Sequence, residues 1–386
     1  MRYLNLAGYI SIPLAYLVHF WLGKGASWEP VTTFILASMG VIPLAHLMGE
    51  ATEHLAERTG PTWGGLLNAT FGNAAELIIA IIALTKGFNE VVKASLTGSI
   101  LGNLLLVGGA AMLVGGWRRE RQHFNPRSAE ANAGLLVLAV AAMLFPAIFH
   151  FTAERLHDVK IIEHEHRVSI GTSVILLAVY GLGLLFTLRT HAHIFSPAGP
   201  KSDQDPHGLE GHERWSVKRS VIMLLLASVG IGLVAELLVG AAEKVAHTFG
   251  WNPIFVGVIL LAIIGNAAEH STAVLLAHRN DMDTAMTICY QSSLQIALFA
   301  TPFLVLLSSL MIATGIGVGG VPVDQRRALD LIFTPMEVVS VILTMLIIVV
   351  IGLNGETNWF EGVLLLALYL ILGIAFFYIP VAGGHG

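Results

Sequence analysis

The sequence is poor in cysteine and in charge. Cys289 is its one cysteine among 386 residues, which excludes an internal disulfide and any cysteine-rich zinc or iron–sulfur site. Charged residues make up 12% of the chain, too few to cover the surface of a soluble protein of this length. The net charge of −5 is spread thinly, which argues against nucleic acid as a partner.

The residues that are present point to a lipid bilayer. Hydrophobic residues make up 55% of the chain, which also contains 40 glycines, and this combination is typical of transmembrane helices. A helix crosses about 30 Å of hydrocarbon with roughly 20 apolar residues. The sequence therefore predicts an all-α polytopic membrane protein with eleven transmembrane helices. The predicted spans are approximately residues 3–22, 31–56, 63–85, 91–116, 131–152, 169–188, 220–245, 253–277, 284–314, 331–353 and 362–382.

The loops predict an orientation and a division into halves. Twelve of the 21 Lys and Arg residues fall in loops that are cytoplasmic if the N-terminus is inside, and the loop WRRERQHFNPR is the most basic of them. The only long connection expected is about residues 190–219. We therefore expect a first helix and linker over 1–30, a five-helix repeat over 31–189, a cytoplasmic linker over 190–219 and a second five-helix repeat over 220–386.

A short motif occurs twice inside apolar stretches. The pentapeptide GNAAE ends at Glu76 in the third span and again at Glu269 in the eighth. Each glutamate is followed 23 residues later by a serine, Ser99 or Ser292. With the predicted orientation the third span runs outward and the eighth inward, so the halves would be antiparallel copies. Inverted repeats of this kind form secondary transporters, which bind their substrate near the midplane between the repeats.

The two motif glutamates need a partner that the chain does not supply. An ionised carboxylate at bilayer depth costs at least about 2–3 kcal/mol. No Lys or Arg lies near Glu76 or Glu269 in the central part of any span. Two carboxylates complement the charge of one divalent cation, and without the cation both burial and mutual repulsion favour their protonated forms. Competition between one dication and about two protons would be an exchange mechanism.

The neighbouring residues suit a hard cation. Asparagine amide oxygens, serine hydroxyls and main-chain carbonyls freed at the motif glycines can complete a shell of six to eight oxygens, which calcium accepts. Thiolate is absent, which disfavours copper and other soft metals. The predicted metal ligands are Glu76, Glu269, Asn73, Asn266, Gly72, Gly265, Ser99 and Ser292.

Other polar residues lie in the second and seventh spans. One face of the second span carries Glu53, His46, Glu57, Glu50 and His54. We interpret Glu53 and Glu236 as acids of a vestibule or proton relay, and Glu50 and Glu57 as solvated charges at its entrance. Glu337 in the tenth span is left open between a helix partner and a pathway.

We assign no part in ion binding to the remaining candidates. Gly102, Gly108 and Gly109 are interpreted as helix-packing residues. Several segments are rich in histidine, which is a common zinc ligand. However, the sequence contains no HExxH motif and no closed four-ligand set, so we expect these histidines to be solvated in loops. These histidine-bearing segments are EHEH at residues 163–166, His191 with His193, and His207 with His212.

The motifs together resemble a known family. GNAAEL and GNAAEH occur with ATEHLAERTGPTWGGLLNATF, VVKASLTGSILGNLLLV, SSLQIALFATPFLVL and NWFEG. In this order, over about residues 43–380, they resemble the calcium/proton exchanger family (cation/proton antiporters) of the cation/calcium exchanger superfamily. The resemblance implies an eleven-helix antiporter with helices 2–6 and 7–11 as inverted repeats. It also implies that Glu76 and Glu269 are central ligands, that Glu53 and Glu236 serve cation access and proton movement, and that His270 is linked to transport.

One departure from the family pattern lies beside the expected site. Gln291 stands where family members usually have a small residue before the serine pair, which would narrow the site or add a ligand. In the seventh span, Ala235 replaces a common serine.

We therefore expect a secondary active antiporter rather than an enzyme. It would exchange calcium for protons by alternating access, with helices 2 and 7 sliding past the remainder. No cofactor is expected, the partners are calcium, protons and the lipid bilayer, and a homo-oligomer is left open. The expected location is a prokaryotic plasma membrane with a cytoplasmic N-terminus. Sodium/calcium exchange, exchange of another divalent cation in the same fold, and a cation channel without proton counterflow are the alternatives.

Overall fold

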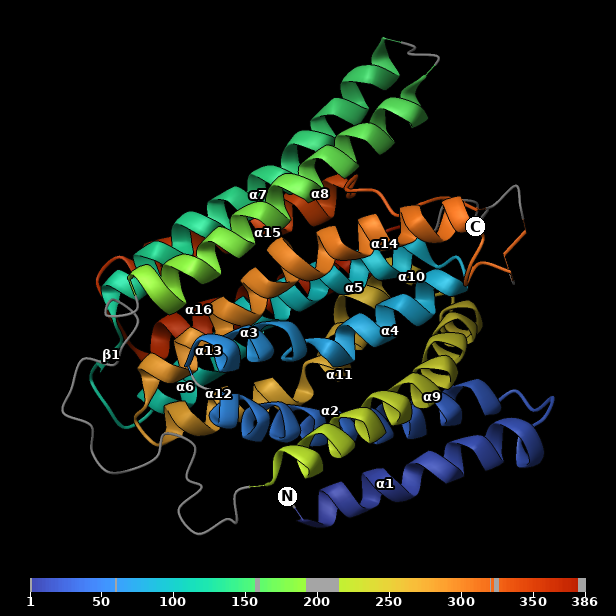
Figure 1. The fold of residues 1–386 in the computed structure, drawn as a ribbon, viewed down its shortest axis with the longest axis horizontal. Coiled ribbons are helices and arrows are strands. Elements are labelled where there is room, and N and C mark those ends of the chain that lie inside the picture. The colour runs from blue at the N-terminus through green and yellow to red at the C-terminus, as the bar shows by residue number, and fades with distance from the viewer. Residues whose placement is uncertain are drawn as a thin grey trace.

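The computed structural model describes residues 2–59, 61–156, 160–191, 215–319, 321–322 and 326–380. Within these ranges the chain is a bundle of long helices with two very short strands (Figure 1). In chain order the elements, with η for a π-helical segment, are α1 (Arg2–Leu17), η1 (Val18–Leu22), α2 (Glu29–Thr59), α3 (Pro61–Phe71), α4 (Ala74–Thr85), α5 (Asn89–Leu101), η2 (Gly102–Val107), α6 (Gly108–Gly116), β1 (Gln122–His123), α7 (Pro126–Arg155), α8 (Ile161–Leu185), η3 (Phe186–Thr190), α9 (Val217–Phe249), α10 (Pro253–Phe255), η5 (Val256–Leu261), α11 (Ala262–Gly265), α12 (Ala267–His278), α13 (Met282–Gln295), η6 (Ile296–Ala300), α14 (Thr301–Thr314), α15 (Pro335–Gly352), β2 (Glu356–Thr357) and α16 (Trp359–Phe377).

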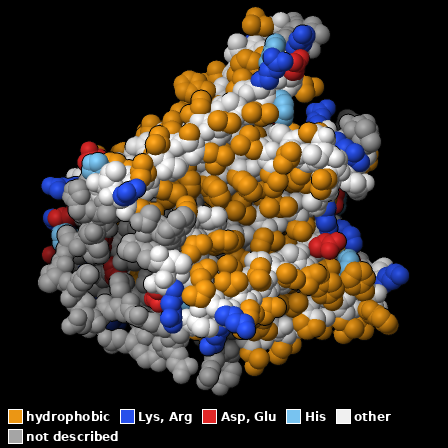
Figure 2. Space-filling view, viewed as in Figure 1, with side chains coloured by type: hydrophobic (Ala, Val, Ile, Leu, Met, Phe, Trp, Pro, Cys, Tyr) orange, Lys and Arg blue, Asp and Glu red, His pale blue; other side chains and the backbone are white. Residues whose placement is uncertain are grey.

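The helices confirm an all-α membrane protein. Among the described residues, eight helices are long and apolar enough to cross a bilayer. The pair Pro253–Gly265 and Ala267–His278 would make a ninth, although it bends by 62°. The first and third predicted spans contain only shorter apolar helices, Leu6–Leu22 and Ala74–Thr85, so the count of eleven remains a prediction. Figure 2 shows hydrophobic side chains over much of the visible face and charged ones mainly at its margins.

The GNAAE motifs interrupt the helices that carry them. Asn73 (φ −102°, ψ 27°) separates α3 from α4, and Asn266 (φ −94°, ψ 7°) separates α11 from α12. Asparagine is a favoured residue before a helix, yet neither side chain caps the helix that follows. Glu76 and Glu269 lie in the first turns of these helices, where free N–H groups favour negative charge. Each motif thus places an asparagine that does not cap its helix close to a carboxylate at a helix break.

Helices α1, α2 and α9 lie together along one side of the bundle (Figure 1). Gly8 allows α1 to approach α2, because a Cβ there would lie 2.7 Å from the carbonyl oxygen of Met39. The Tyr16 hydroxyl donates a hydrogen bond to the Leu233 carbonyl of α9 at 3.0 Å. At one end, Glu29 of α2 lies 2.6 Å from His19 Nδ1 and 3.7 Å from Lys244 of α9. The three helices are therefore joined to one another along their length.

The interior of the bundle contains a very close helix crossing. A Cβ on Gly98 of α5 would lie 2.5 Å from the Cα of Val258 in η5 and would collide with the Val258 carbonyl oxygen. A Cβ on Gly257 would lie 2.6 Å from the Cβ of Ala94. Glycine is needed at both positions because the two backbones approach each other directly.

Two short strands close one end of the bundle, which we call the strand end. Gln122 pairs with Thr357 and His123 with Glu356 in an antiparallel ladder. Arg121 adds an ion pair to Glu356 at 2.8 Å. The segments before α7 and before α16, which are far apart in sequence, are thereby fastened together.

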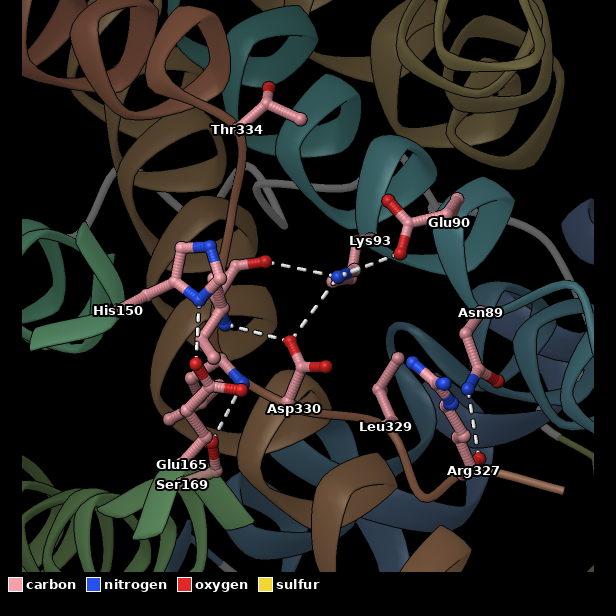
Figure 3. A network of polar contacts seen from close by, with 12 residues as sticks. Asn89, Glu90, Lys93, His150, Glu165, Ser169, Arg327, Leu329, Asp330 and Thr334 are labelled. Atoms are coloured by element: carbon pink, nitrogen blue, oxygen red, sulfur yellow. Dashed lines mark hydrogen bonds and ion pairs between the residues drawn. The ribbon is translucent and has the colours of Figure 1, made fainter. Parts of the chain in front are cut away.

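At the other end, which we call the Lys93 end, a long connection is held by polar contacts (Figure 3). Residues 315–334 join α14 to α15, so the prediction that residues 190–219 form the only long connection is wrong. The buried Lys93 ammonium lies 2.9 Å from Glu90, 3.2 Å from Asp330 and 2.9 Å from the Ile332 carbonyl oxygen. Leu331 N–H donates to Ser169 Oγ of α8 at 3.0 Å. The described part of this segment forms no helix of its own, and side chains from α5 and α8 hold it in position instead.

Replacing Lys93 with methionine should destabilise the protein more than replacing Arg121 with methionine. Lys93 is 7% exposed and contacts two carboxylates and a carbonyl, whereas Arg121 is 69% exposed and pairs with Glu356 alone. We expect Lys93→Met to lower the free energy of unfolding by about 1–3 kcal/mol, and Arg121→Met by less than about 1 kcal/mol. Thermal unfolding in detergent checks this. Equal losses would contradict the role given to Lys93.

The helices α7 and α8 form a hairpin that projects beyond the neighbouring helices (Figure 1). Residues 163–166 lie in the first turns of α8, so their predicted place in a loop is wrong. The helix begins before its apolar part because two ion pairs stabilise its polar first turns. Glu163 pairs with Arg167, and Glu165 pairs with His150 of α7, each at 2.6 Å. His191 stacks on Phe186. His193, His207 and His212 lie outside the described residues.

Candidate ion-binding site

The two GNAAE motifs meet inside the bundle. A Cβ on Gly265 would lie 3.4 Å from Cγ and 3.6 Å from Oε1 of Glu76, so the side chain of one motif reaches the backbone of the other. Glu76 therefore lies against the helix break that precedes Glu269. In Figure 1 the chain runs through α3 and α4 in the direction opposite to that through α10, α11 and α12. Tertiary structure thus brings together two glutamates that are distant in sequence.

Each motif asparagine uses its amide nitrogen in hydrogen bonds and leaves its side-chain oxygen unpaired within the described chain. Asn266 Nδ2 donates to Ser99 Oγ and to the Ala262 carbonyl, both at 2.9 Å. Asn73 Nδ2 donates to Gln295 Oε1 at 2.5 Å. Both side chains are at most 2% exposed, and the Oδ1 atom of each is buried without a hydrogen-bond partner in the described chain. A buried acceptor left unpaired costs about 1–3 kcal/mol, so these two oxygens call for a donor or a cation.

The serines and glycines contribute unequally. Ser292 donates to Glu269 Oε2 at 2.5 Å, whereas Ser99 accepts from Asn266. A Cβ on Gly72 would lie 3.3 Å from Gln295 Oε1, so glycine leaves space for that amide. The halves are similar in residue type but not in hydrogen bonding, which the motif repeat did not predict.

The carboxylates have no basic partner among the described residues: neither Glu76 nor Glu269 forms an ion pair with Lys, Arg or His. Within the same ranges, no three His, Cys, Asp or Glu side chains gather as a metal cluster. The oxygens available are therefore two carboxylates with amides and hydroxyls. This set fits a hard divalent cation or protons better than it fits zinc.

His270 follows Glu269 and faces η2. Its Nε2 lies 3.2 Å from Asn103 Oδ1, and its Cε1 lies 3.9 Å from where a Cβ on Gly102 would be. The Asn103 amide nitrogen is buried without a partner in the described chain. His270 therefore lies at the edge of the site, one residue from a carboxylate.

The expected vestibule acids differ in their surroundings. Glu53 of α2 is partly exposed and Glu236 of α9 is exposed. Lys86, which ends α4, donates to the main-chain carbonyl of Glu236 at 3.0 Å. In the polar face of α2, His54 is buried and stacks on Trp215, which sequence periodicity did not predict.

Glu337, which the sequence left open, has a structural role at a helix start. Its carboxylate accepts hydrogen bonds from the Thr334 N–H and hydroxyl at 2.9 and 2.8 Å. It also accepts one from Thr97 Oγ1 at 3.3 Å. Glu337 therefore caps α15 and joins it to α5.

Sequence reasoning missed Gln295 and Asn103. Gln295 follows Ser292 by three residues, as Gly102 follows Ser99, so the two halves differ at one equivalent position. An amide side chain within a membrane helix was the available signal, because polar groups at this depth need a partner. Its partner, Asn73, lies 222 residues away.

Comparison with known proteins was made for the whole chain. The family described as Sodium/calcium exchanger protein matches this chain twice, over residues 30–189 and 219–378. The chain is 41% identical to a Ca(2+)/H(+) antiporter of Synechocystis over 96% of both chains. It is 39% identical to the Ca(2+)/H(+) antiporter ChaA of Bacillus subtilis, over 92% of this chain and 95% of the relative.

Solved structures show the same architecture. That of native YfkE superposes with a TM-score of 0.77 at 36% identity, covering 97% of this chain and 100% of the other. The H+/Ca2+ exchanger CAX superposes with a TM-score of 0.59 at 13% identity, covering 96% and 92%. The second likeness concerns the fold alone.

Proposed function

Because this chain belongs to the sodium/calcium exchanger protein family, as its motifs predicted, we propose that it is a secondary active antiporter that exchanges calcium for protons across a membrane. Relatives about 40% identical over nearly the whole chain are named Ca(2+)/H(+) antiporters, which favours protons over sodium as the counter-ion. The protein would move ions and catalyse no covalent reaction. Calcium and protons are its substrates, and no cofactor is needed for the exchange.

One observation carries the proposal. Glu76 reaches the backbone of the motif that carries Glu269, neither carboxylate has a basic partner in the described chain, and the amide oxygens of Asn73 and Asn266 are unpaired there. A dication neutralises both carboxylates, and in its absence burial and repulsion favour protonation. Either a dication or protons can neutralise the two carboxylates, but the two cannot bind there at the same time. The proposed ligands are Glu76, Glu269, Asn73, Asn266, the main chain at Gly72 and Gly265, and the hydroxyls of Ser99 and Ser292.

The proposed architecture is a first helix followed by two inverted five-helix repeats, eleven spans in all. The double family match supports a division into residues 1–30, 31–189, 190–219 and 220–386, because its limits fall close to these boundaries. The opposite directions of the two motif segments in Figure 1 support the inversion. Alternating access would come from α2 and α9 moving against the remaining helices, with α1 attached to them.

The proposal extends to orientation and to the outer residues of the pathway. The basic loops favour a cytoplasmic N-terminus, which would make the strand end cytoplasmic as well. Bacterial relatives favour a plasma membrane. Glu53 and Glu236 would guide cations or protons on either side of the site, and His270 would affect transport through its place beside Glu269.

Reconstituted vesicles test the exchange. Purified protein in liposomes with an acidic interior should take up calcium, because protons leaving the vesicle release the carboxylates for the cation. An internal calcium indicator and a pH indicator report the two fluxes, and collapse of the pH gradient should stop both. Protein-free liposomes are the control. Manganese and magnesium, added as competitors, define the cation selectivity.

A sodium gradient tests the second candidate, which the description of the family favours. Calcium uptake that requires internal sodium and ignores the pH gradient would establish sodium/calcium exchange instead. Calcium flux without any counter-ion would indicate a channel. Either result would overturn calcium/proton antiport.

A further inference from the structure

A polar, partly exposed stripe runs along α13 toward the site. Thr284, Thr287, Gln291 and Gln295 fall within about 80° of one another at 100° per residue. All four are partly exposed, and Ile288 lies just outside their arc. In a membrane helix, polar groups that are not buried against protein face a water-filled space. The hydrogen bond from Asn125 N–H to Asp283 at 2.8 Å places the beginning of this stripe at the strand end.

The equivalent stripe in the first half is closed. Counted from Ser99 as the first stripe is from Ser292, its positions are Val91, Ala94, Gly98 and Gly102. Gly98 packs directly on the backbone of η5, and Ala94 contacts Gly257. The route to the carboxylates is therefore lined by hydroxyls and amides on the strand side and by small, packed residues on the Lys93 side. This difference lies in the sequences of the halves and is not a matter of conformation alone.

Gln291 is held so that its amide oxygen stays available. Its Nε2 donates to Asn132 Oδ1 of α7 at 3.1 Å, and Asn132 is 1% exposed. No donor in the described chain reaches Gln291 Oε1. Gln291 directly precedes Ser292, which donates to Glu269, and lies one helical turn before Gln295, which accepts from Asn73. An amide oxygen is thus fixed next to Ser292 and one helical turn before Gln295, on the open side of the site.

We propose that Gln291 Oε1 is a transient ligand for the dication on its way between the strand end and the two glutamates, with Asn132 as its positioning residue. The inference rests on the proposed calcium/proton exchange. A neutral amide replaces one water of the cation but does not take up a proton at physiological pH, so this step serves the cation alone. It favours calcium over magnesium, which loses its water reluctantly.

The test measures calcium transport from a defined side. Arg121→Cys provides one exposed thiol at the strand end, because the native Cys289 is buried, and an impermeant reagent then reports vesicle orientation. In this background, Gln291→Ala should raise the KM for calcium at the strand end about tenfold, the size expected for losing one interaction with a charged group. The maximal rate, the dependence on proton concentration and the KM from the Lys93 end should stay unchanged. The preference for calcium over magnesium should fall.

Companion variants separate a cation ligand from a structural contact. Asn132→Ala should raise the same KM by about threefold, because the Gln291 amide then loses its anchor. Gln291→Glu should lower the KM and make it dependent on pH, because the new carboxyl can be protonated. Ser309→Ala on α14, away from the stripe, is the matched control and should change nothing. Size-exclusion profiles and thermal unfolding confirm that each variant is folded.

The outcomes distinguish this inference from the proposed function. Wild-type protein without calcium uptake driven by the pH gradient would remove the proposed function itself. Normal wild-type exchange with a KM for Gln291→Ala within twofold of normal would overturn the role of Gln291. A fall in maximal rate with an equal shift in proton dependence would also overturn it, because the residue would then act through the carboxylates.

Discussion

Substituting glutamine for Glu76 or for Glu269 is expected to reduce calcium uptake driven by a pH gradient by at least about 100-fold. Each substitution leaves a dication with one carboxylate, and no other acid among the described residues joins the pair as a metal cluster. At partly buried positions the lost attraction amounts to about 3–4 kcal/mol, and each 1.4 kcal/mol is a factor of ten. Glutamine is nearly isosteric, so the fold should survive. Initial rates in proteoliposomes, normalised to inserted protein, are the measurement.

The control for this prediction is Glu163→Gln. Glu163 lies at the surface of the projecting hairpin and, within the described part of the chain, pairs only with the exposed Arg167, so its loss should leave transport within twofold of normal. Proton release upon calcium binding gives a second readout. The wild-type protein should release protons when calcium is added, and either site variant should release fewer. Transport above half the normal rate in both Glu76→Gln and Glu269→Gln would end the assignment of this site.

Substituting valine for Gly98 should have the largest effect on stability. The first added carbon would collide with the main chain at Val258, and backbone cannot rotate away as a side chain can. Separating α5 from η5 would also disturb Ser99, which holds Asn266. We expect a loss of about 3 kcal/mol or more, since overpacking of a tight core typically costs 1–3 kcal/mol before backbone conflict is added. Little folded protein should be recovered from detergent.

Gly134 and Gly171 supply the matched comparison, because a Cβ at either would meet nothing within 4 Å. Gly134→Ala and Gly171→Ala should leave stability unchanged or raise it by up to about 1 kcal/mol, owing to the better helix propensity of alanine. Fluorescence-detected size exclusion after a temperature series ranks the variants. If Gly98→Val melted within two degrees of Gly134→Ala, the close crossing described here would be wrong.

The sequence predicted much of the site because its signals are local. GNAAE stands out in a membrane span since a carboxylate there is costly, and the repeat identified its counterpart without any structure. Ser292 was found by equal spacing, and it does bind Glu269. Gln295 and Asn132 were missed, because an isolated amide in a helix does not reveal which helix it contacts.

The remaining errors have similar physical causes. The segment at residues 163–166 is polar and was assigned to a loop, yet contacts with His150 and Arg167 continue the helix. Residues 331–334 were assigned to the start of the tenth span, yet α15 begins only at Pro335 and the segment 326–334 is not helical. Their backbone groups are satisfied by Lys93 and Ser169, which come from other parts of the chain.

The amino-acid sequence alone determined that this protein lies in a membrane as helices, and that two acidic motifs lie within them. Both follow from the free-energy cost of exposing polar groups to lipid, because this cost depends on each segment alone. Only the tertiary structure decided that Asn73 meets Gln295, that Asn266 meets Ser99, and that α13 presents polar side chains where α5 is packed shut. Such pairings depend on helix rotation and crossing distance, which small residues such as Gly98 set through contacts between distant segments.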